Sequence, residues 1–330
     1  MDFHAEFFPV AFKKKIEHNE KLLLIGSCFT EQIGTKLSSF KFDMLQNPNG
    51  ILFNPVSIVH ALHSYVDEKK FTSDDLFYHN ELWSSWKHHS RFSGMDKNQV
   101  LSDINKSQSD AHSFLKNANW LLITLGSAFV YEQVVTPKDS SYNEVVANCH
   151  KIPLDKFNRR LLDPEEIKNV LKSIINKVKV FNPKLNIIFT ISPVRHLREG
   201  FIGNNRSKAA LIQAVHGLVN DDFIFYFPAY ELIIDDLRDY RFYAEDMVHP
   251  NYSATGYVWE KFVSTCVDIR SQEIMKEIGV INAAINHKPF NPESDQHKKF
   301  KNIHLQKISM MMQKHHYLNF NKEISFLSMD

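Results

Sequence analysis

The chain has 330 residues, of which 43% are hydrophobic and 23% charged, so it can bury a large core without a disulfide or a metal to hold it together. Lysine and arginine (39) nearly balance aspartate and glutamate (38), and the net charge of +1 excludes a strong field that would attract nucleic acid or an anionic membrane. No stretch approaches the roughly 20 apolar residues of a membrane span, and the three cysteines are too widely spaced for a disulfide framework or a zinc site. We therefore expect a soluble, cytoplasmic protein without a metal or cofactor, and the composition gives no sign of its oligomeric state.

Short apolar runs alternate with helical periodicities along the chain. Each run is followed by glycine, serine or proline, residues that commonly end a strand. Continuous apolar strands separated by helices are typical of a parallel sheet that is covered on both faces. The sequence therefore predicts a three-layer α/β/α sandwich with a mainly parallel sheet. In chain order, we expect strand 22–25, helix 30–40, helix 104–117, strand 120–125, helix 163–180, strand 186–191, helix 208–219 and strand 223–227.

Two regions depart from this alternation. Residues 47–94 are less regular, and we interpret them as an inserted cap with a helix near 56–65. From about residue 269 onward the chain is helical and polar. We therefore predict a catalytic domain over residues 1–268 and a helical C-terminal extension over residues 269–330.

Parallel sheets bind ligands at the carboxyl ends of their strands, so the residues that follow each strand are the first candidates for a site. Ser27 follows the first strand directly, after Gly26, which permits a tight turn. The helix behind Ser27 directs its N–H groups and positive dipole end at the turn, where an oxyanion would be stabilised. Ser27 is therefore either the nucleophile of acyl chemistry or a plain helix N-cap.

A second short motif favours the nucleophile. Asp246 and His249 lie after the last strand, shortly before a helix expected to begin near Tyr252. An aspartate three residues before a histidine can orient the ring through Nδ1 and leave Nε2 free to accept a serine proton. The pair predicts a catalytic Ser27–His249–Asp246 arrangement in which His249 is the general base.

These motifs resemble the GSCFA domain family, which looks like a divergent branch of the SGNH (GDSL-type) hydrolases. The resemblance implies an SGNH hydrolase-like fold with a flavodoxin-like strand order. It also implies that Ser27 belongs to the first conserved block, that Asp246 and His249 form the last, and that the N–H of Gly50 in the second helps to hold the oxyanion. The likeness covers about residues 20–268 and rests on Gly26-Ser27-Cys28-Phe29, Asn47-Pro48-Asn49-Gly50-Ile51, Asn54-Pro55, Thr124-Leu125-Gly126-Ser127, Asn148-Cys149-His150, Ser192-Pro193-Val194-Arg195-His196 and 237–250.

The third block departs from this pattern. SGNH hydrolases carry Gly-x-Asn-Asp there, and the asparagine donates a hydrogen bond to the oxyanion. The segment Gly126-Ser127-Ala128-Phe129 has no amide side chain at that position. Losing one oxyanion donor costs about 3–4 kcal/mol of transition-state stabilisation. The substitutes to consider are Asn148, Asn49 and Ser127, in that order.

Other polar residues have competing interpretations. His89 is a substrate contact or part of a surface loop. Arg195 and His196 follow the third predicted strand on the rim where substrate should lie, and Arg195 either binds an anionic group or forms a structural salt bridge. Cys28 is a rival nucleophile or a buried packing residue. The spacing of the histidines does not indicate a metal site.

Three functions remain open. The first is a serine-dependent hydrolase that acts on acyl esters, an esterase or O-deacetylase whose substrate is a small molecule or a carbohydrate. The second is an O-acyltransferase that uses the same residues with a hydroxyl in place of water. The third is a catalytically idle binding module of the same fold, which the missing third-block asparagine favours.

Overall fold

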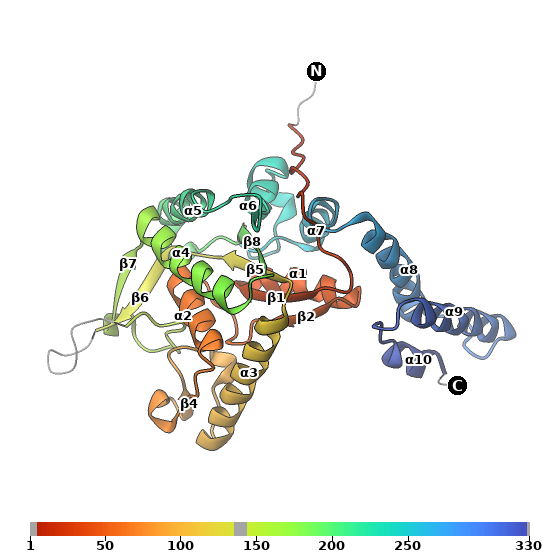
Figure 1. Cartoon of the computed structure of the whole chain (residues 1–330), viewed down its shortest axis with the longest axis horizontal. Coiled ribbons are helices and arrows are strands. Elements are labelled where there is room, and N and C mark those ends of the chain that lie inside the picture. Colours follow the sequence, from red (N-terminus) through yellow and green to blue (C-terminus); the bar gives the residue numbers. More distant parts are fainter. Residues whose placement is uncertain (1–4, 135–143, 329–330) are drawn as a thin grey trace.

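Five parallel strands form the central sheet of the computed structural model, which describes residues 5–134 and 144–328 (Figure 1). Their order is β2–β1–β5–β8–β9, the flavodoxin-like order that the resemblance implied. The short edge strand β2 was not predicted, because its four residues are only partly buried and form no apolar run. The strands are β1 (Lys21–Gly26), β2 (Asp43–Gln46), β5 (Trp120–Leu125), β8 (Asn186–Ile191) and β9 (Ile224–Tyr226).

Helices pack on both faces of this sheet, which confirms the predicted α/β sandwich. Successive strand residues point to opposite faces, so Leu23 and Ile25 of β1 enter one hydrophobic core while Leu22 and Leu24 enter the other. The first core is closed by α2 (Pro55–Val66), α3 (Lys97–Asn117), α4 (Pro164–Phe181) and α5 (Gly200–His216). The second is closed by α1 (Cys28–Ser39) and α7 (Tyr252–Cys266), with the single turn α6 (Ala229–Glu231) beside them.

Two antiparallel hairpins lie outside the central sheet. They are β3 (Phe77–His79) with β4 (Leu82–Ser84), and β6 (Phe129–Gln133) with β7 (Phe157–Leu161). The first hairpin lies in the segment predicted as an inserted cap. Helix α2 lies in the same segment but packs in the main core, so part of residues 47–94 belongs to the helical layer.

Three helices follow the sandwich, as predicted: α8 (Ile269–Asn286), α9 (Asp295–Lys314) and α10 (Asn321–Ser328). They project from the main body (Figure 1) and bury a hydrophobic cluster of their own. Lys41 joins the two parts, because its ammonium pairs with Glu323 at 2.6 Å and lies 5.3 Å from the ring centre of Phe320.

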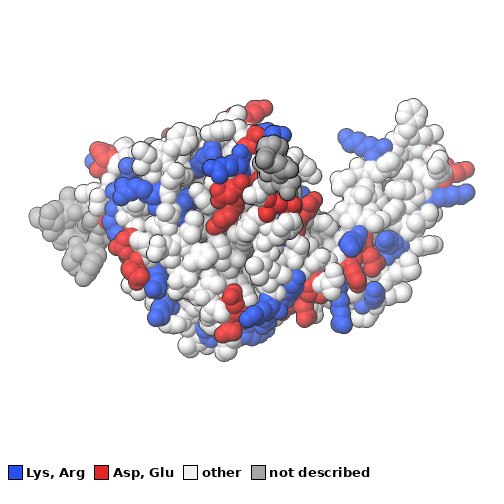
Figure 2. Space-filling model, turned by 90° about the horizontal axis from the view of Figure 1, so that it is seen from above, with Lys and Arg blue, Asp and Glu red and all other residues white. Residues whose placement is uncertain are grey.

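Charge is spread over the surface with both signs interspersed, as Figure 2 shows for one face of the molecule. Within the described ranges, every helix is too short or too polar to span a bilayer.

Gly26 ends β1 in a conformation that other residues avoid. Its φ is +146°, and an added Cβ would lie 2.2 Å from the carbonyl oxygen of Thr124 on the neighbouring strand β5. The chain can therefore turn from β1 into α1 at this point only because residue 26 has no side chain.

We expect Gly26→Ala to lower the free energy of unfolding by about 2–4 kcal/mol, through backbone strain and the clash with Thr124. Urea denaturation measures the change. Gly256→Ala in α7 is the matched control, because an added Cβ there meets nothing within 4 Å. It should stabilise the helix by about 0.5–1 kcal/mol. Equal effects of the two substitutions would contradict the role given to Gly26.

Candidate active site

The carboxyl ends of β1, β5 and β8 meet at one edge of the sheet. The N–H of Ser27 donates to the carbonyl of Thr124 at 3.2 Å, and the N–H of Ser192 donates to the carbonyl of Leu125 at 2.8 Å. The N–H of Gly126 donates to the carbonyl of Phe53 at 2.8 Å. The segments that follow the three strands are thus fixed relative to one another, at the edge where the strand order changes direction.

Asp246 and His249 form the hydrogen-bonded pair that their spacing predicted. Nδ1 of His249 lies 2.7 Å from Oδ2 of Asp246. The other carboxylate oxygen accepts the N–H groups of Val248 at 2.9 Å and His249 at 3.0 Å. These bonds lower the pKa of Asp246 to about 2. Because an ionised carboxylate only accepts, the proton of the neutral ring is on Nδ1 and the lone pair of Nε2 is free.

Cys28, and not Ser27, faces the free nitrogen of His249. The sulfur of Cys28 lies 3.6 Å from Nε2 of His249. The hydroxyl of Ser27 is buried and has no hydrogen-bond partner among the described residues. The sequence predicted Ser27 at the position that Cys28 occupies.

The direction of the two side chains follows from the start of α1. Ser27 is the extended residue before the helix, and its Cβ lies 3.3 Å from the point where a Cβ on Gly126 would stand. Cys28 is the first helical residue and points away from β5, towards the loop that carries His249. A signal was present in the sequence: in the letters of the GDSL motif, serine stands two residues after glycine, as Cys28 does after Gly26.

The thiol of Cys28 is protonated until a base removes its proton. Burial raises the pKa of Cys28, whereas the backbone N–H groups of Phe29 and Cys28 itself and the charge of Lys208 lower it. These two N–H groups belong to the first turn of α1, where no intrahelical carbonyl is available to them. They are therefore placed to stabilise negative charge beside the sulfur.

The second-block residues are engaged elsewhere in this structure. The N–H of Gly50 donates to the carbonyl of Asn47 at 2.8 Å. The side chain of Asn49 is buried, accepts from the hydroxyl of Tyr65 at 2.6 Å and donates to the carbonyl of Lys87 at 3.0 Å. Asn49 therefore has a structural role in the loop, whereas the sequence predicted it as a possible oxyanion donor.

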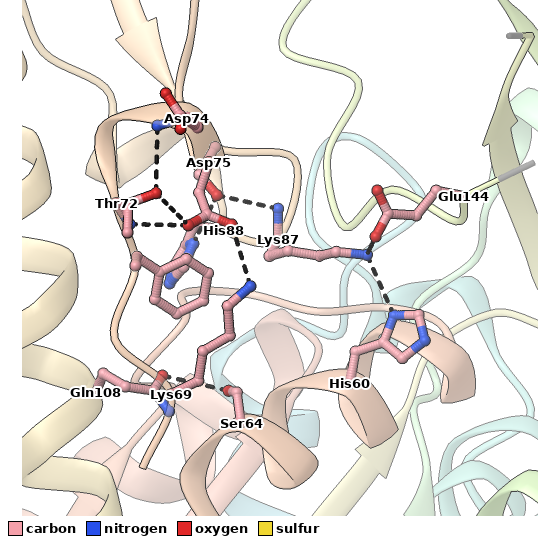
Figure 3. Close-up of polar contacts among 12 residues, drawn as sticks. His60, Ser64, Lys69, Thr72, Asp74, Asp75, Lys87, His88, Gln108 and Glu144 are labelled. Carbon is pink, nitrogen blue, oxygen red and sulfur yellow. Dashed lines mark hydrogen bonds and ion pairs between the residues drawn. The ribbon is translucent and has the colours of Figure 1, made fainter. Parts of the chain in front are cut away.

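His89 lies next to Gly50 and caps a short turn. Its Nδ1 accepts the N–H of Arg91 at 3.3 Å, and its Cβ packs against Gly50. The loop before it is anchored by polar contacts: in Figure 3, Lys87 points towards Glu144 and towards His60, whose Nδ1 lies 3.4 Å from the ammonium. His89 is thus held at the second-block loop.

The remaining candidates border a cavity of about 570 Å³, which Cys28 and His249 do not line. Ser127, Asn148, Arg195 and His196 all line it. The hydroxyl of Ser127 lies 3.3 Å from that of Ser207 and accepts the N–H of Phe129 at 3.1 Å, so it is already engaged. The side-chain oxygen of Asn148 accepts the N–H of His150 at 2.7 Å. Arg195 forms no ion pair with any described carboxylate, and stacks instead on the ring of Tyr243, 4.3 Å from its centre.

Lys208 of α5 is a buried residue that the sequence analysis did not single out. Its ammonium donates to the carbonyls of Gly126 at 2.6 Å and Ser192 at 2.7 Å, which joins the ends of β5 and β8. Burial lowers the pKa of Lys208 to about 7. A lone lysine in a helical pattern looks like a surface residue, so its burial could not be read from the sequence.

No cluster of metal-ligating side chains is found in the described part of the chain. The site is built from a thiol, an imidazole, a carboxylate and backbone N–H groups.

Comparison with known proteins identifies the family. The model described as GSCFA family matches residues 21–262. The chain belongs to the GSCFA family. A second model, described as GSCFA domain protein, C-terminal domain, matches residues 278–328, which contain the second half of α8 and all of α9 and α10. No curated protein matches this chain.

Two solved structures resemble the chain at low similarity. One is a carbohydrate esterase of family 3 from Talaromyces cellulolyticus, with a TM-score of 0.35, 8% identity, and coverage of 79% of this chain and 99% of the other. The second is a mutant acetyl esterase with an acetate ion, with a TM-score of 0.36, 8% identity and the same coverage. At this level of similarity, neither carries its chemistry over to the GSCFA chain.

The stability of this GSCFA family member should depend on pH, because the pKa of Lys208 is lowered in the folded state. The ordinary pKa of a lysine is 10.5, so unfolding takes up a proton between about pH 7 and that value. Lys208 therefore destabilises the fold most below pH 7. As pH rises from 7 to 9, the free energy of unfolding should increase by about 2 kcal/mol from this residue.

Lys208→Met should remove that increase, which urea denaturation at the two pH values measures. Lys172→Met, at an exposed position of α4, is the control and should keep the dependence of the wild type. An unchanged pH dependence in Lys208→Met would show that Lys208 stays charged throughout this range.

Proposed function

We propose that this protein hydrolyses or transfers acyl esters, with Cys28 as nucleophile, His249 as general base and Asp246 as the residue that orients the base. The contact of 3.6 Å between the Cys28 sulfur and Nε2 of His249 carries the proposal. The bond of 2.7 Å on the other side of the ring completes a Cys–His–Asp line. This is the order of groups used in nucleophilic acyl transfer.

The reaction proceeds in two steps. Nε2 of His249 takes the thiol proton as the sulfur of Cys28 attacks the ester carbonyl, and the leaving alkoxide then takes that proton from the ring as the C–O bond breaks. The acyl group remains on Cys28 as a thioester. Water, or the hydroxyl of an acceptor, then attacks the thioester while His249 takes its proton. The C–S bond breaks, and the sulfur of Cys28 takes that proton from the ring, which restores the thiol.

The oxyanion of each step needs hydrogen-bond donors. The N–H groups of Cys28 and Phe29 lie beside the sulfur and serve as the first donors. The N–H of Gly50 becomes available only if its bond to the carbonyl of Asn47 opens. The amide nitrogen of Asn148 has no hydrogen bond within the described residues, and Asn148 borders the cavity, so it remains the candidate replacement for the missing third-block asparagine.

Ser27 is the nucleophile that the sequence predicted, and its hydroxyl would have to leave its buried position to reach a substrate. The idle binding module is supported by the engaged N–H of Gly50 and the missing asparagine. The substrate class, a small-molecule or carbohydrate ester, also belongs to the proposal. The cytoplasmic location is also part of the proposal, because a free thiol stays reduced there.

Substitution of the two adjacent residues separates these alternatives. With p-nitrophenyl acetate, we expect Cys28→Ala to lower kcat/KM by about 10³-fold or more, because no thioester can form. Ser27→Ala should retain most activity, since removing a buried, unpaired hydroxyl disturbs little. Mass spectrometry of protein trapped with the ester should place the acyl group on the peptide that contains residue 28.

The opposite result, with activity lost in Ser27→Ala and kept in Cys28→Ala, would assign the nucleophile to Ser27. Equal and negligible turnover of wild type and both variants, without acyl adduct, would favour the binding module.

The orienting role of Asp246 predicts a distinct effect. Asp246→Asn should lower kcat by about 10²–10⁴-fold and change KM little, because an amide holds the ring less well and favours the wrong tautomer. A further variant tests His249 itself. His249→Ala should slow alkylation of Cys28 by iodoacetamide, because the base that takes the thiol proton is removed. Cys149 in the same chain is the internal control, and its alkylation should not change. Equal alkylation of Cys28 in wild type and His249→Ala would exclude His249 as its base.

A further inference from the structure

The cavity lined by Arg195 and His196 is larger than a small acyl group requires, and no residue of the Cys28–His249–Asp246 group lines it. Its volume of about 570 Å³ is in the range of sites that enclose whole small molecules. Its walls come from β6, the loop 146–154 and the segment that follows β8.

One contact ties this cavity to the loop that carries His249, and a second fixes His196 in the cavity wall. The backbone N–H of Arg195 donates to the carbonyl of Val248, the residue before His249, at 3.3 Å. The ring of His196 packs edge-on against that of Phe53, with centres 5.4 Å apart, and both residues line the cavity. A molecule bound against Arg195 and His196 is thus next to the loop that holds the base.

The cavity carries an excess of positive charge. Arg195, Arg198 and Lys151 line it, and none of them forms an ion pair with a carboxylate in the described part of the chain. Glu199, the acidic residue in the wall, is already paired with Arg159 of β7 at 2.7 Å and accepts the hydroxyl of Tyr131 at 3.3 Å. Its ion pair is with Arg159, which does not line the cavity, but its charge also acts on Arg198, whose pKa is raised first by a hydrogen bond to Tyr131.

The guanidinium of Arg195 is held in place but not satisfied. The rings of Tyr243 and Tyr240 lie 4.3 Å and 5.1 Å from its central carbon, and its buried Nη1 has no hydrogen-bond partner among the described residues. Nε2 of His196 is likewise buried and without a partner. Arg195 and His196 both line the cavity, although these two nitrogens are themselves buried. A guanidinium fixed at a cavity wall matches the oxygens of a carboxylate or a phosphate.

We propose that this cavity binds an anionic group, a carboxylate or phosphate, carried by the ester on which the Cys28–His249–Asp246 group acts. Arg195 contacts the anion, while Arg198 and Lys151 add attraction from the rim. The link to ester chemistry rests on the proposed function, whereas the binding of the anion does not.

Calorimetric titration tests the binding without any turnover. The protein is Cys28→Ala, and the probes are succinate, inorganic phosphate and the neutral succinamide. We expect one of the two anions to bind at least about 10-fold more tightly than succinamide, and to lose affinity as KCl is added. The comparison of succinate with phosphate shows which anionic group the cavity prefers.

Substitutions locate the bound anion. In the same background, Arg195→Gln and Arg198→Gln should each weaken binding by about 10-fold, the loss of one charged hydrogen bond. Arg206→Gln removes the same charge from an exposed position of α5 that does not line the cavity, and should leave binding within about 2-fold of the parent. If Arg195→Gln does not fold, as judged by thermal melting, the exposed Arg198 decides the result.

Two results would overturn this inference: anions that bind no better than succinamide, or an equal loss in Arg206→Gln and in the cavity variants. Because Cys28 is absent from the titrated protein, neither result bears on the proposed reaction. Conversely, the absence of an acyl group on Cys28 of the wild-type protein would contradict the proposed function. Anion binding would then stand as a separate finding.

Discussion

The close approach of Gly26 to Thr124 is the constraint on which the site depends. A backbone carbonyl of β5 occupies the space where any side chain of residue 26 would lie, so β1 must turn here and α1 must begin within two residues. The turn directs Ser27 towards β5 and Cys28 towards the loop of His249. The turn at Gly26 thus places Cys28, and not Ser27, in contact with Nε2 of His249.

The fold was predictable where burial leaves a strong pattern. The strands β5 and β8 are buried on both faces, so their continuous apolar runs gave the observed bounds. The hairpin of β6 and β7 was missed, because β7 contains Asn158, Arg159 and Arg160 and has no apolar run. It pairs with β6 through an antiparallel backbone ladder, and Arg160 adds ion pairs to Glu132 of β6 and Glu166 of α4. Such long-range pairing leaves no local trace in the sequence.

In the site, too, local contacts could be predicted from the sequence and long-range contacts could not. The contact of Asp246 with His249 is local, set by a spacing of three residues in one turn, and the sequence was enough to predict it. The choice between Ser27 and Cys28 depends on a rotation of the chain at the start of α1, for which the spacing of Cys28 from Gly26 was a signal that the prediction of Ser27 did not use. The burial of Lys208 depends on three separate segments meeting, and no local pattern records that.

A thiol at this position fits a site with few oxyanion donors. The pKa of a thiol is much closer than that of a serine hydroxyl to the pKa of imidazole, so transferring its proton to His249 requires less free energy. The sulfur is also intrinsically the better nucleophile. Part of the barrier that a third donor lowers in a serine hydrolase is then lowered by the nucleophile itself. On this argument the missing third-block asparagine and the presence of Cys28 are connected, because a thiol depends less on the donor that this chain lacks.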